Sequence, residues 1–250
     1  MLTEYEEYDY TVNHQEKTFN NNNTKRRSKK RIKQISAKPS GLSLKEICPK
    51  TKNQQSVFDA YRNGDHCVLH GVAGTGKTFI LSFLALQEII NTSKQKLVYI
   101  RSVVPSRDIG FLPGTEIEKS KVYESPYESI VQEIAGRGDA YAIFKRKKQI
   151  EFLTTSFLRG TTIDNAVVIV DEAQNMSFQE LDTIITRIGN NTRICIAGDF
   201  RQSDLQFSGL MKFMTILQRI KNFSFIDFST ADIVRSGLVK DYIIAREHFT

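Results

Sequence analysis

The sequence lacks several features, and each absence excludes a class of protein. No apolar run approaches the roughly 20 residues that a membrane-spanning helix needs, so we expect no membrane partner. The N-terminus is acidic and has no apolar core, which excludes a secretory signal. The only three cysteines, Cys48, Cys67 and Cys195, are too far apart for a C-x-x-C metal or redox pair. We therefore expect reduced, mostly buried thiols in a cytoplasmic protein.

The basic excess of the chain is concentrated near its N-terminus. Residues 1–50 carry 11 Lys/Arg and 6 Asp/Glu, a net +5 of the +7 for the whole chain. Seven of the nine residues at 25–33 are basic, and such a block repels itself and buries little. We expect residues 1–40 to be a disordered tail before a folded domain over 51–250. The tail either holds a phosphate backbone through counterion release or is a solubilising segment with no specific partner.

From about residue 51 the chain alternates between strand and helix patterns. Apolar runs predict strands at 67–70, 97–100, 167–170, 193–197 and 223–226. Helical periodicity and a Ser177/Glu180 capping box predict helices at 77–90, 126–135, 178–188, 209–220 and 238–246, with a loop at 105–113. This alternation predicts an α/β fold, a parallel sheet with helices on both faces.

The strongest motif is G-V-A-G-T-G-K-T at 71–78, which matches the P-loop pattern G-x-x-x-x-G-K-[ST] at every position. Glycines let the backbone wrap phosphate oxygens, and the exposed N–H groups at a helix start bind anions. The nucleotide-binding residues are therefore predicted to be Gly71, Val72, Ala73, Gly74, Thr75, Gly76, Lys77 and Thr78. In this arrangement Lys77 reaches the β- and γ-phosphates, and the Thr78 hydroxyl ligates Mg²⁺.

An acidic pair, Asp171 and Glu172, ends the apolar run at 167–170. The end of such a strand lies at the carboxyl edge of the sheet, where ligands bind. Asp171 is predicted to hold Mg²⁺ through water, and Glu172 to polarise the attacking water as a general base. Together with the P-loop, the pair predicts a P-loop NTPase that hydrolyses ATP.

Three weaker signals remain, and the first two would add residues to the predicted site. Gln202 follows the strand at 193–197 and is expected to contact the γ-phosphate, unless the segment is an ordinary turn. The segment Asn53-Gln54-Gln55 lies upstream of the P-loop, and a glutamine amide, for which we choose Gln55, suits the adenine edge, although polar residues at a solvated helix start are nearly as good an explanation. The second basic run, at 145–148, is interpreted as a solvated helix face rather than a nucleic-acid contact.

Taken together, these motifs resemble the PhoH family, whose ATPase domain is similar to the first motor domain of superfamily 1 helicases. The resemblance covers about residues 52–246. Beyond the P-loop it rests on Arg101 with G-F-L-P-G at 110–114, Pro126-Tyr127, S-F-L-R-G-T at 156–161, D-E-A-Q-N at 171–175, G-D-F-R-Q at 198–202 and D-I-V-R at 232–235. Ser102 stands where proline commonly follows the arginine.

The resemblance implies a RecA-like fold, ATP and Mg²⁺ as cofactors, and RNA or single-stranded nucleic acid as the partner of a helicase-like motor. The alternative is a nucleotide-gated binding module that recruits nucleic acid or protein without unwinding. Glu172 and Gln202 disfavour a small P-loop kinase, which must exclude water. The upstream segment is too short and polar for the nuclease domain that some members carry. The Trp-free, Asn/Lys-rich composition is similar to stand-alone forms of bacteria and bacteriophages, so we expect a bacterial or phage-infected cytoplasm.

The predicted folded part makes only one motor domain, whereas helicases of this superfamily close two over ATP. We therefore predict a homo-oligomer with ATP sites at subunit interfaces, a hexameric ring by resemblance to related motors. Arg235 is predicted to act on the phosphates of a neighbouring chain. The alternative is that Arg235 pairs with Asp232 or caps the last helix.

Overall fold

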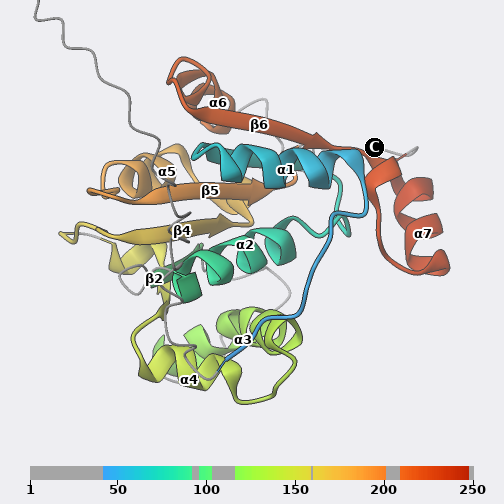
Figure 1. The fold of residues 1–250 in the computed structure, drawn as a ribbon. Helices are drawn as coiled ribbons and strands as arrows, with labels where there is room; N and C mark the ends of the chain where they lie inside the picture. Colours follow the sequence, from blue (N-terminus) through green and yellow to red (C-terminus); the bar gives the residue numbers. More distant parts are fainter. Residues whose placement is uncertain (1–41, 92–95, 103–115, 159, 201–208, 248–250) are drawn as a thin grey trace, which may run out of the picture. The chain divides into compact units, whose positions relative to one another are not determined.

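A six-stranded parallel sheet forms the centre of the part of the chain that the computed structural model describes, residues 42–91, 96–102, 116–158, 160–200 and 209–247 (Figure 1). Its strands are β1 (His66–Gly71), β2 (Lys96–Arg101), β3 (Ile150–Thr154), β4 (Ala166–Asp171), β5 (Arg193–Gly198) and β6 (Phe223–Phe228). They lie in the order β3-β2-β4-β5-β1-β6. Because all neighbours are parallel, the carboxyl ends of the strands share one edge of the sheet.

Helices cover both faces of this sheet. One face carries α1 (Lys52–Arg62), α2 (Lys77–Asn91), α3 (Glu116–Ala135) and α4 (Ala140–Arg146), and the other carries α5 (Phe178–Ile185) and α6 (Leu210–Leu217). In Figure 1, α1 and α2 lie in front of the sheet and α5 lies behind it. The last helix, α7 (Gly237–Glu247), packs through Ile243 on Val72 and Ile233. The predicted α/β architecture is confirmed.

Alternating side chains of each strand supply the two halves of the core. In β1, Cys67 and Leu69 face the α1–α4 side, whereas Val68 between them faces α5 and α6. All six residues of β4 are buried, since both faces of this central strand are covered. Two covered faces explain why its sequence is a continuous apolar run instead of an alternating pattern.

The structure differs from the sequence prediction where local patterns are weak. The helix expected from residue 126 begins at Glu116 and has Pro126 in its interior, although an interior proline removes a hydrogen bond and usually marks a boundary. For α1 and α4 the sequence indicated only a helix start near Gln55 and a helix face at 145–148, without bounds. Strand β3 was not predicted; it is an edge strand, and most of its side chains are only partly buried. The Ser177/Glu180 capping box is confirmed, but α5 ends at Ile185 instead of residue 188.

Three predicted features lie outside the described residues: the tail at 1–40, the loop at 105–113 and Gln202. In the ranges that the structure does describe, no helix is long and apolar enough to cross a membrane.

Candidate active site

The P-loop leaves β1 at a point where only glycine fits. Gly71 has φ +121°, and a Cβ atom there would lie 1.9 Å from the Phe228 carbonyl oxygen of β6. Gly74 and Gly76 also have positive φ, which glycine adopts without a steric penalty. The loop therefore turns tightly between the end of β1 and the start of α2.

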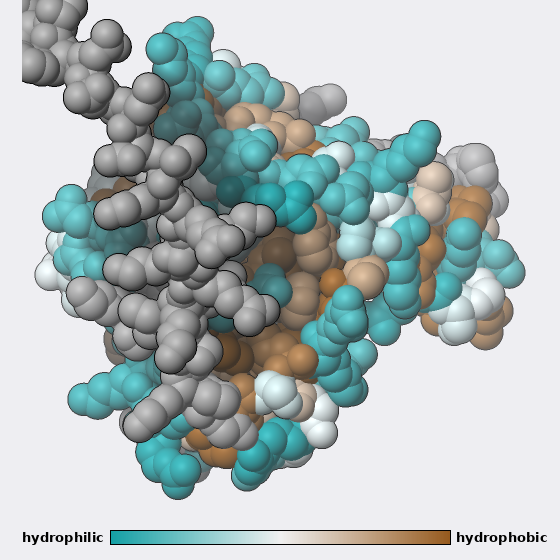
Figure 2. Space-filling model, in the orientation of Figure 1, coloured by the Kyte–Doolittle hydropathy of each residue, from teal (hydrophilic) through white to brown (hydrophobic). Residues whose placement is uncertain are grey.

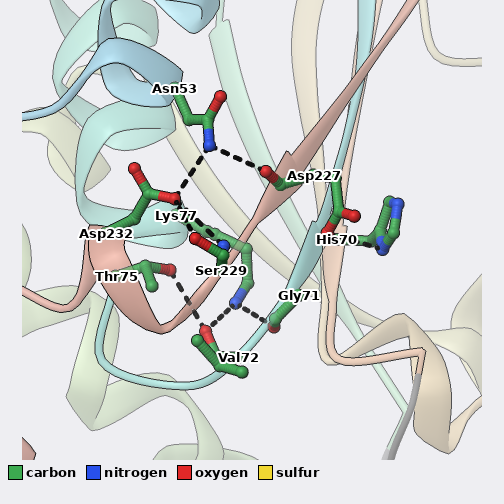
Figure 3. Close-up of polar contacts among 9 residues, drawn as sticks. All are labelled: Asn53, His70, Gly71, Val72, Thr75, Lys77, Asp227, Ser229 and Asp232. Carbon is green, nitrogen blue, oxygen red and sulfur yellow. Dashed lines mark hydrogen bonds and ion pairs between the residues drawn. The ribbon is translucent and has the colours of Figure 1, made fainter.

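The Lys77 amine lies inside this loop. Its Nζ donates to the carbonyl oxygens of Gly71, at 2.7 Å, and Val72, at 2.8 Å (Figure 3). The Thr75 hydroxyl donates to the same Val72 carbonyl at 3.2 Å. A positive charge is thus fixed within the loop for which the motif predicts phosphate binding.

Asp171 meets the P-loop helix across the sheet edge. The Thr78 hydroxyl donates to Asp171 Oδ1 at 2.7 Å, joining two motifs 93 residues apart. They meet because β4 is separated from β1 by β5 alone. Burial raises the pKa of Asp171 and the nearby Glu172 charge raises it too, whereas the hydrogen bond from Thr78 lowers it; the net direction is upward.

These two side chains fit a magnesium ion. A carboxylate and a hydroxyl are oxygen ligands of the kind that Mg²⁺ prefers, and Mg²⁺ usually keeps several waters and takes substrate phosphates as further ligands. Among the described residues, no cluster of three or more His, Cys, Asp or Glu forms a metal cage. Thr78 and Asp171 therefore suit an ion that arrives with a nucleotide.

Glu172 adopts a backbone conformation that is rare for its residue type. Its φ is +53°, in the left-handed region, which costs free energy for a residue with a Cβ and is concentrated at functional sites. Its carboxylate accepts a hydrogen bond from the Gln174 amide, whose oxygen accepts the N–H of Asp199. Asp199 follows β5 and precedes Gln202 in the sequence. Gln174 therefore links Glu172 to the residue that follows β5 and holds the Glu172 carboxylate at the pocket.

A cleft of about 660 Å³ contains these groups. Its further walls come from Ile47, Cys48 and Lys50 ahead of α1, from Arg101 at the end of β2, and from Pro126, Tyr127 and Ile130 of α3. The volume lies in the range of small-molecule sites. A nucleotide whose phosphates bind the P-loop would have room for its base in the same cleft.

The predicted adenine contact, Gln55, lies outside this pocket. Gln55 is exposed, and its amide donates to Asp59 at 2.9 Å. Its neighbour Gln54 is buried and lines the cleft, donating to the Thr75 carbonyl at 3.0 Å and accepting from the Lys50 N–H at 2.6 Å. Consecutive residues of a helix point in different directions, and the sequence did not define which glutamine faces inward.

Arg235 lines the pocket of its own chain, whereas the sequence favoured action on a neighbouring chain. The Val234 N–H donates to the Gly74 carbonyl at 3.1 Å, which draws this segment onto the P-loop. Within the described residues, Arg235 and Asp232 form no ion pair. Asp232 is buried and instead accepts from Asn53 and Ser229 (Figure 3). Asp232 thus fixes the turn that holds Arg235 in place.

The placement of Cys48 gives a direct test of occupancy. Cys48 is exposed and lines the cleft, whereas Cys67 and Cys195 are fully buried. N-ethylmaleimide should therefore alkylate Cys48 first, and saturating ADP with Mg²⁺ should slow this reaction several-fold by covering the thiol. Peptide mass spectrometry measures the rates. Lys77→Ala should lose the protection, and equal rates with and without ADP in the wild type would place the nucleotide elsewhere.

Comparisons with known proteins find similar sequences over most of this chain. The family model described as "PhoH: PhoH-like protein" matches residues 46–247. The PhoH-like protein of Synechocystis sp. is 35% identical over 202 residues, covering 79% of this chain and 61% of that protein. The PhoH-like protein of Bacillus subtilis is 33% identical over 205 residues, covering 80% and 64%. This chain thus spans less than two thirds of either relative.

A solved structure shares the fold at low sequence identity. The large terminase from the thermophilic bacteriophage D6E, in complex with ATP-gamma-S, superposes with a TM-score of 0.50. The identity is 13%, and the match covers 78% of this chain and 48% of that one. This likeness concerns the arrangement of the sheet and its helices.

Proposed function

Because this chain belongs to the PhoH-like protein family, we propose that it is an enzyme that hydrolyses ATP in the cleft between the P-loop and the Asp171–Glu172 pair. One observation carries the proposal: Thr78 of the P-loop helix lies 2.7 Å from Asp171, immediately before a Glu172 held in a left-handed conformation. A site that only binds the nucleotide needs the P-loop but no carboxylate beside the phosphates. A fixed carboxylate beside the phosphate position suits the activation of water.

Each residue of the cleft has a proposed role. The P-loop N–H groups and Lys77 bind the phosphates, and Glu172 orients and deprotonates the attacking water. Thr78 and Asp171 would hold Mg²⁺, which would neutralise phosphate charge when bound. Gln202 contacts the γ-phosphate in this proposal. Arg235, which lines the cleft of its own chain, is proposed to supply a further cation there, and action on a neighbouring chain is the alternative.

Nucleic acid is the proposed partner, most simply single-stranded RNA or DNA in a bacterial or phage-infected cytoplasm. Two features support it: the family membership and the seven basic residues at 25–33. The test is ATP turnover, and equilibrium binding by fluorescence anisotropy, with RNA and DNA oligonucleotides of one sequence. Stimulated turnover with strand separation supports a helicase-like motor. Binding without turnover supports the nucleotide-gated module.

Deleting residues 1–40 should weaken nucleic-acid binding and leave basal ATP turnover largely unchanged, because the pocket uses residues from 47 onward. For every single-strand phosphate that the shortened chain no longer binds, the slope of log K against log salt concentration should flatten by about 0.7. Titrations at several salt concentrations measure this slope for both forms. Identical slopes would leave the tail with a solubilising role.

Self-association is proposed to use the outer face of α7. Ile243 of this helix packs inward, whereas Leu238 is 84% exposed and Tyr242, one turn further on, is 66% exposed. Figure 2 shows hydrophobic residues interspersed with polar ones on this part of the surface, at the right of the view. Exposed apolar side chains that lie side by side mark interaction surfaces on many proteins. Because Val234 and Arg235, just before α7, line the cleft, a second copy on this face would lie beside the nucleotide.

Leu238→Glu should therefore lower the molar mass in solution to that of the monomer, since it buries a charge in the proposed interface. Light scattering coupled to size-exclusion chromatography measures the mass. Met211→Glu is the matched control, because Met211 is 57% exposed on α6 and lies outside the proposed interface. An unchanged mass for Leu238→Glu would remove α7 from the interface.

A further inference from the structure

Both oxygens of the Asp171 carboxylate accept a hydroxyl hydrogen bond. Thr78 donates to Oδ1, and the hydroxyl of Tyr127 donates to Oδ2 at 2.9 Å. Tyr127 belongs to α3 and is fully buried. Rotation of the carboxylate would break both bonds, so Tyr127 and Thr78 together fix its orientation.

A second buried tyrosine is linked to Thr78 through hydrogen bonds. Tyr99 of β2 is fully buried and stacks on Tyr127, with ring centroids 4.3 Å apart and an interplanar angle of 23°. Its hydroxyl donates to Ser82 Oγ at 2.9 Å, and Ser82 Oγ donates to the Thr78 carbonyl at 2.7 Å. The stacked pair therefore reaches both candidate metal ligands, Asp171 directly and Thr78 through Ser82.

The two phenols have their acceptors fixed by the packing: Tyr127 donates to Asp171 and Tyr99 donates to Ser82. A buried hydroxyl without an acceptor costs free energy, which favours the one side-chain arrangement that pairs every donor.

We infer that Tyr127 is a positioning residue for Mg²⁺: it holds Asp171 so that Oδ1 faces Thr78 and the incoming nucleotide, while Tyr99 keeps Thr78 in place. Partners that orient a metal ligand without touching the metal strongly affect affinity, and removing one typically costs 10–100-fold. The inference rests on the proposed function, because it assumes that Mg²⁺ binds with the nucleotide at Thr78 and Asp171.

Tyr127→Phe tests this role, because it keeps the stacked ring and removes only the hydroxyl. Binding of a fluorescent N-methylanthraniloyl ADP is measured while Mg²⁺ is titrated. The Mg²⁺ concentration for half-saturation should rise about tenfold or more. Nucleotide affinity in EDTA should stay at the wild-type value, since the P-loop contacts are intact. Tyr99→Phe should shift the titration in the same direction by less, because its contact is indirect.

Two other buried tyrosines provide matched controls. Tyr61 donates to Glu88 and Tyr141 donates to Glu124, and neither tyrosine lines the cleft. Their phenylalanine variants also remove a buried hydroxyl bond, so they should reduce thermal stability by a comparable amount but keep the wild-type Mg²⁺ titration. A Tyr127→Phe titration equal to that of Tyr61→Phe overturns the inference alone. ADP binding by the wild type that is independent of Mg²⁺ also overturns the inference alone, whereas wild-type protein that binds no ADP overturns the proposed function and this inference with it.

Discussion

Replacing Lys77 with alanine is expected to abolish ATP turnover. The Lys77 amine is the only side-chain cation that the P-loop motif itself supplies, and two loop carbonyls hold it in place. Removing one preorganised group that stabilises transition-state charge costs roughly 10²–10³-fold in rate. The loss here should reach at least that size, and nucleotide affinity should fall too, because the amine also binds the ground-state phosphates.

Phosphate release and N-methylanthraniloyl ADP binding measure the two effects of Lys77→Ala. Lys52→Ala is the matched control, since Lys52 is an exposed lysine of α1 that does not line the cleft. Near-normal turnover by Lys77→Ala, in protein freed of contaminating ATPases, would refute the assignment of this loop as the phosphate site.

Glu172→Gln is expected to separate binding from hydrolysis. The amide keeps the shape of the side chain, and its oxygen can still accept the hydrogen bond from Gln174. It cannot take a proton from water. General-base catalysis typically contributes 10²–10⁴-fold, so turnover should fall by about that factor while ATP still binds.

The contrast between the two variants is measured by ATP retention. After filtration through a desalting column, Glu172→Gln should keep bound ATP in unhydrolysed form, whereas Lys77→Ala should keep little nucleotide. Equal loss of ATP binding in both variants would argue against separate roles for the lysine and the glutamate.

Those parts of the site that form continuous motifs were predictable from the sequence. The P-loop is one segment of eight residues, and its chemistry depends on its own backbone and on glycines that must stand at fixed positions. Asp171 follows a buried strand, so its place at the carboxyl edge follows from the parallel sheet. The meeting of Thr78 and Asp171 could therefore be expected before their 2.7 Å contact was known.

Other parts of the site depend on which way a side chain points, and local sequence does not determine this. Gln54 and Gln55 are chemically identical neighbours, and only the packing of α1 buries the first. The role of Tyr127 depends on where α3 lies relative to β4, 44 residues along the chain. Arg235 reaches its own P-loop because the Val234 N–H donates to the Gly74 carbonyl, and a pattern of side chains cannot predict such a backbone hydrogen bond.

The exposed face of α7 shows a related limit. Sequence periodicity predicted the helix at 238–246, but Leu238 and Ile243 look equally suited to a core. Only the structure shows that Ile243 is buried while Leu238 is 84% exposed. An exposed apolar surface such as this one can therefore be identified only after the fold is known.

The central claim is that this cleft hydrolyses ATP and does not merely bind it. A single-turnover experiment tests it most directly: protein in excess over radiolabelled ATP and Mg²⁺, sampled over time and separated by thin-layer chromatography. The account predicts that the wild type converts bound ATP to ADP and phosphate, while Glu172→Gln holds ATP intact over the same period. ATP that stays bound and uncleaved in the wild type, with or without single-stranded RNA or DNA, would contradict the account and leave a nucleotide-gated binding module.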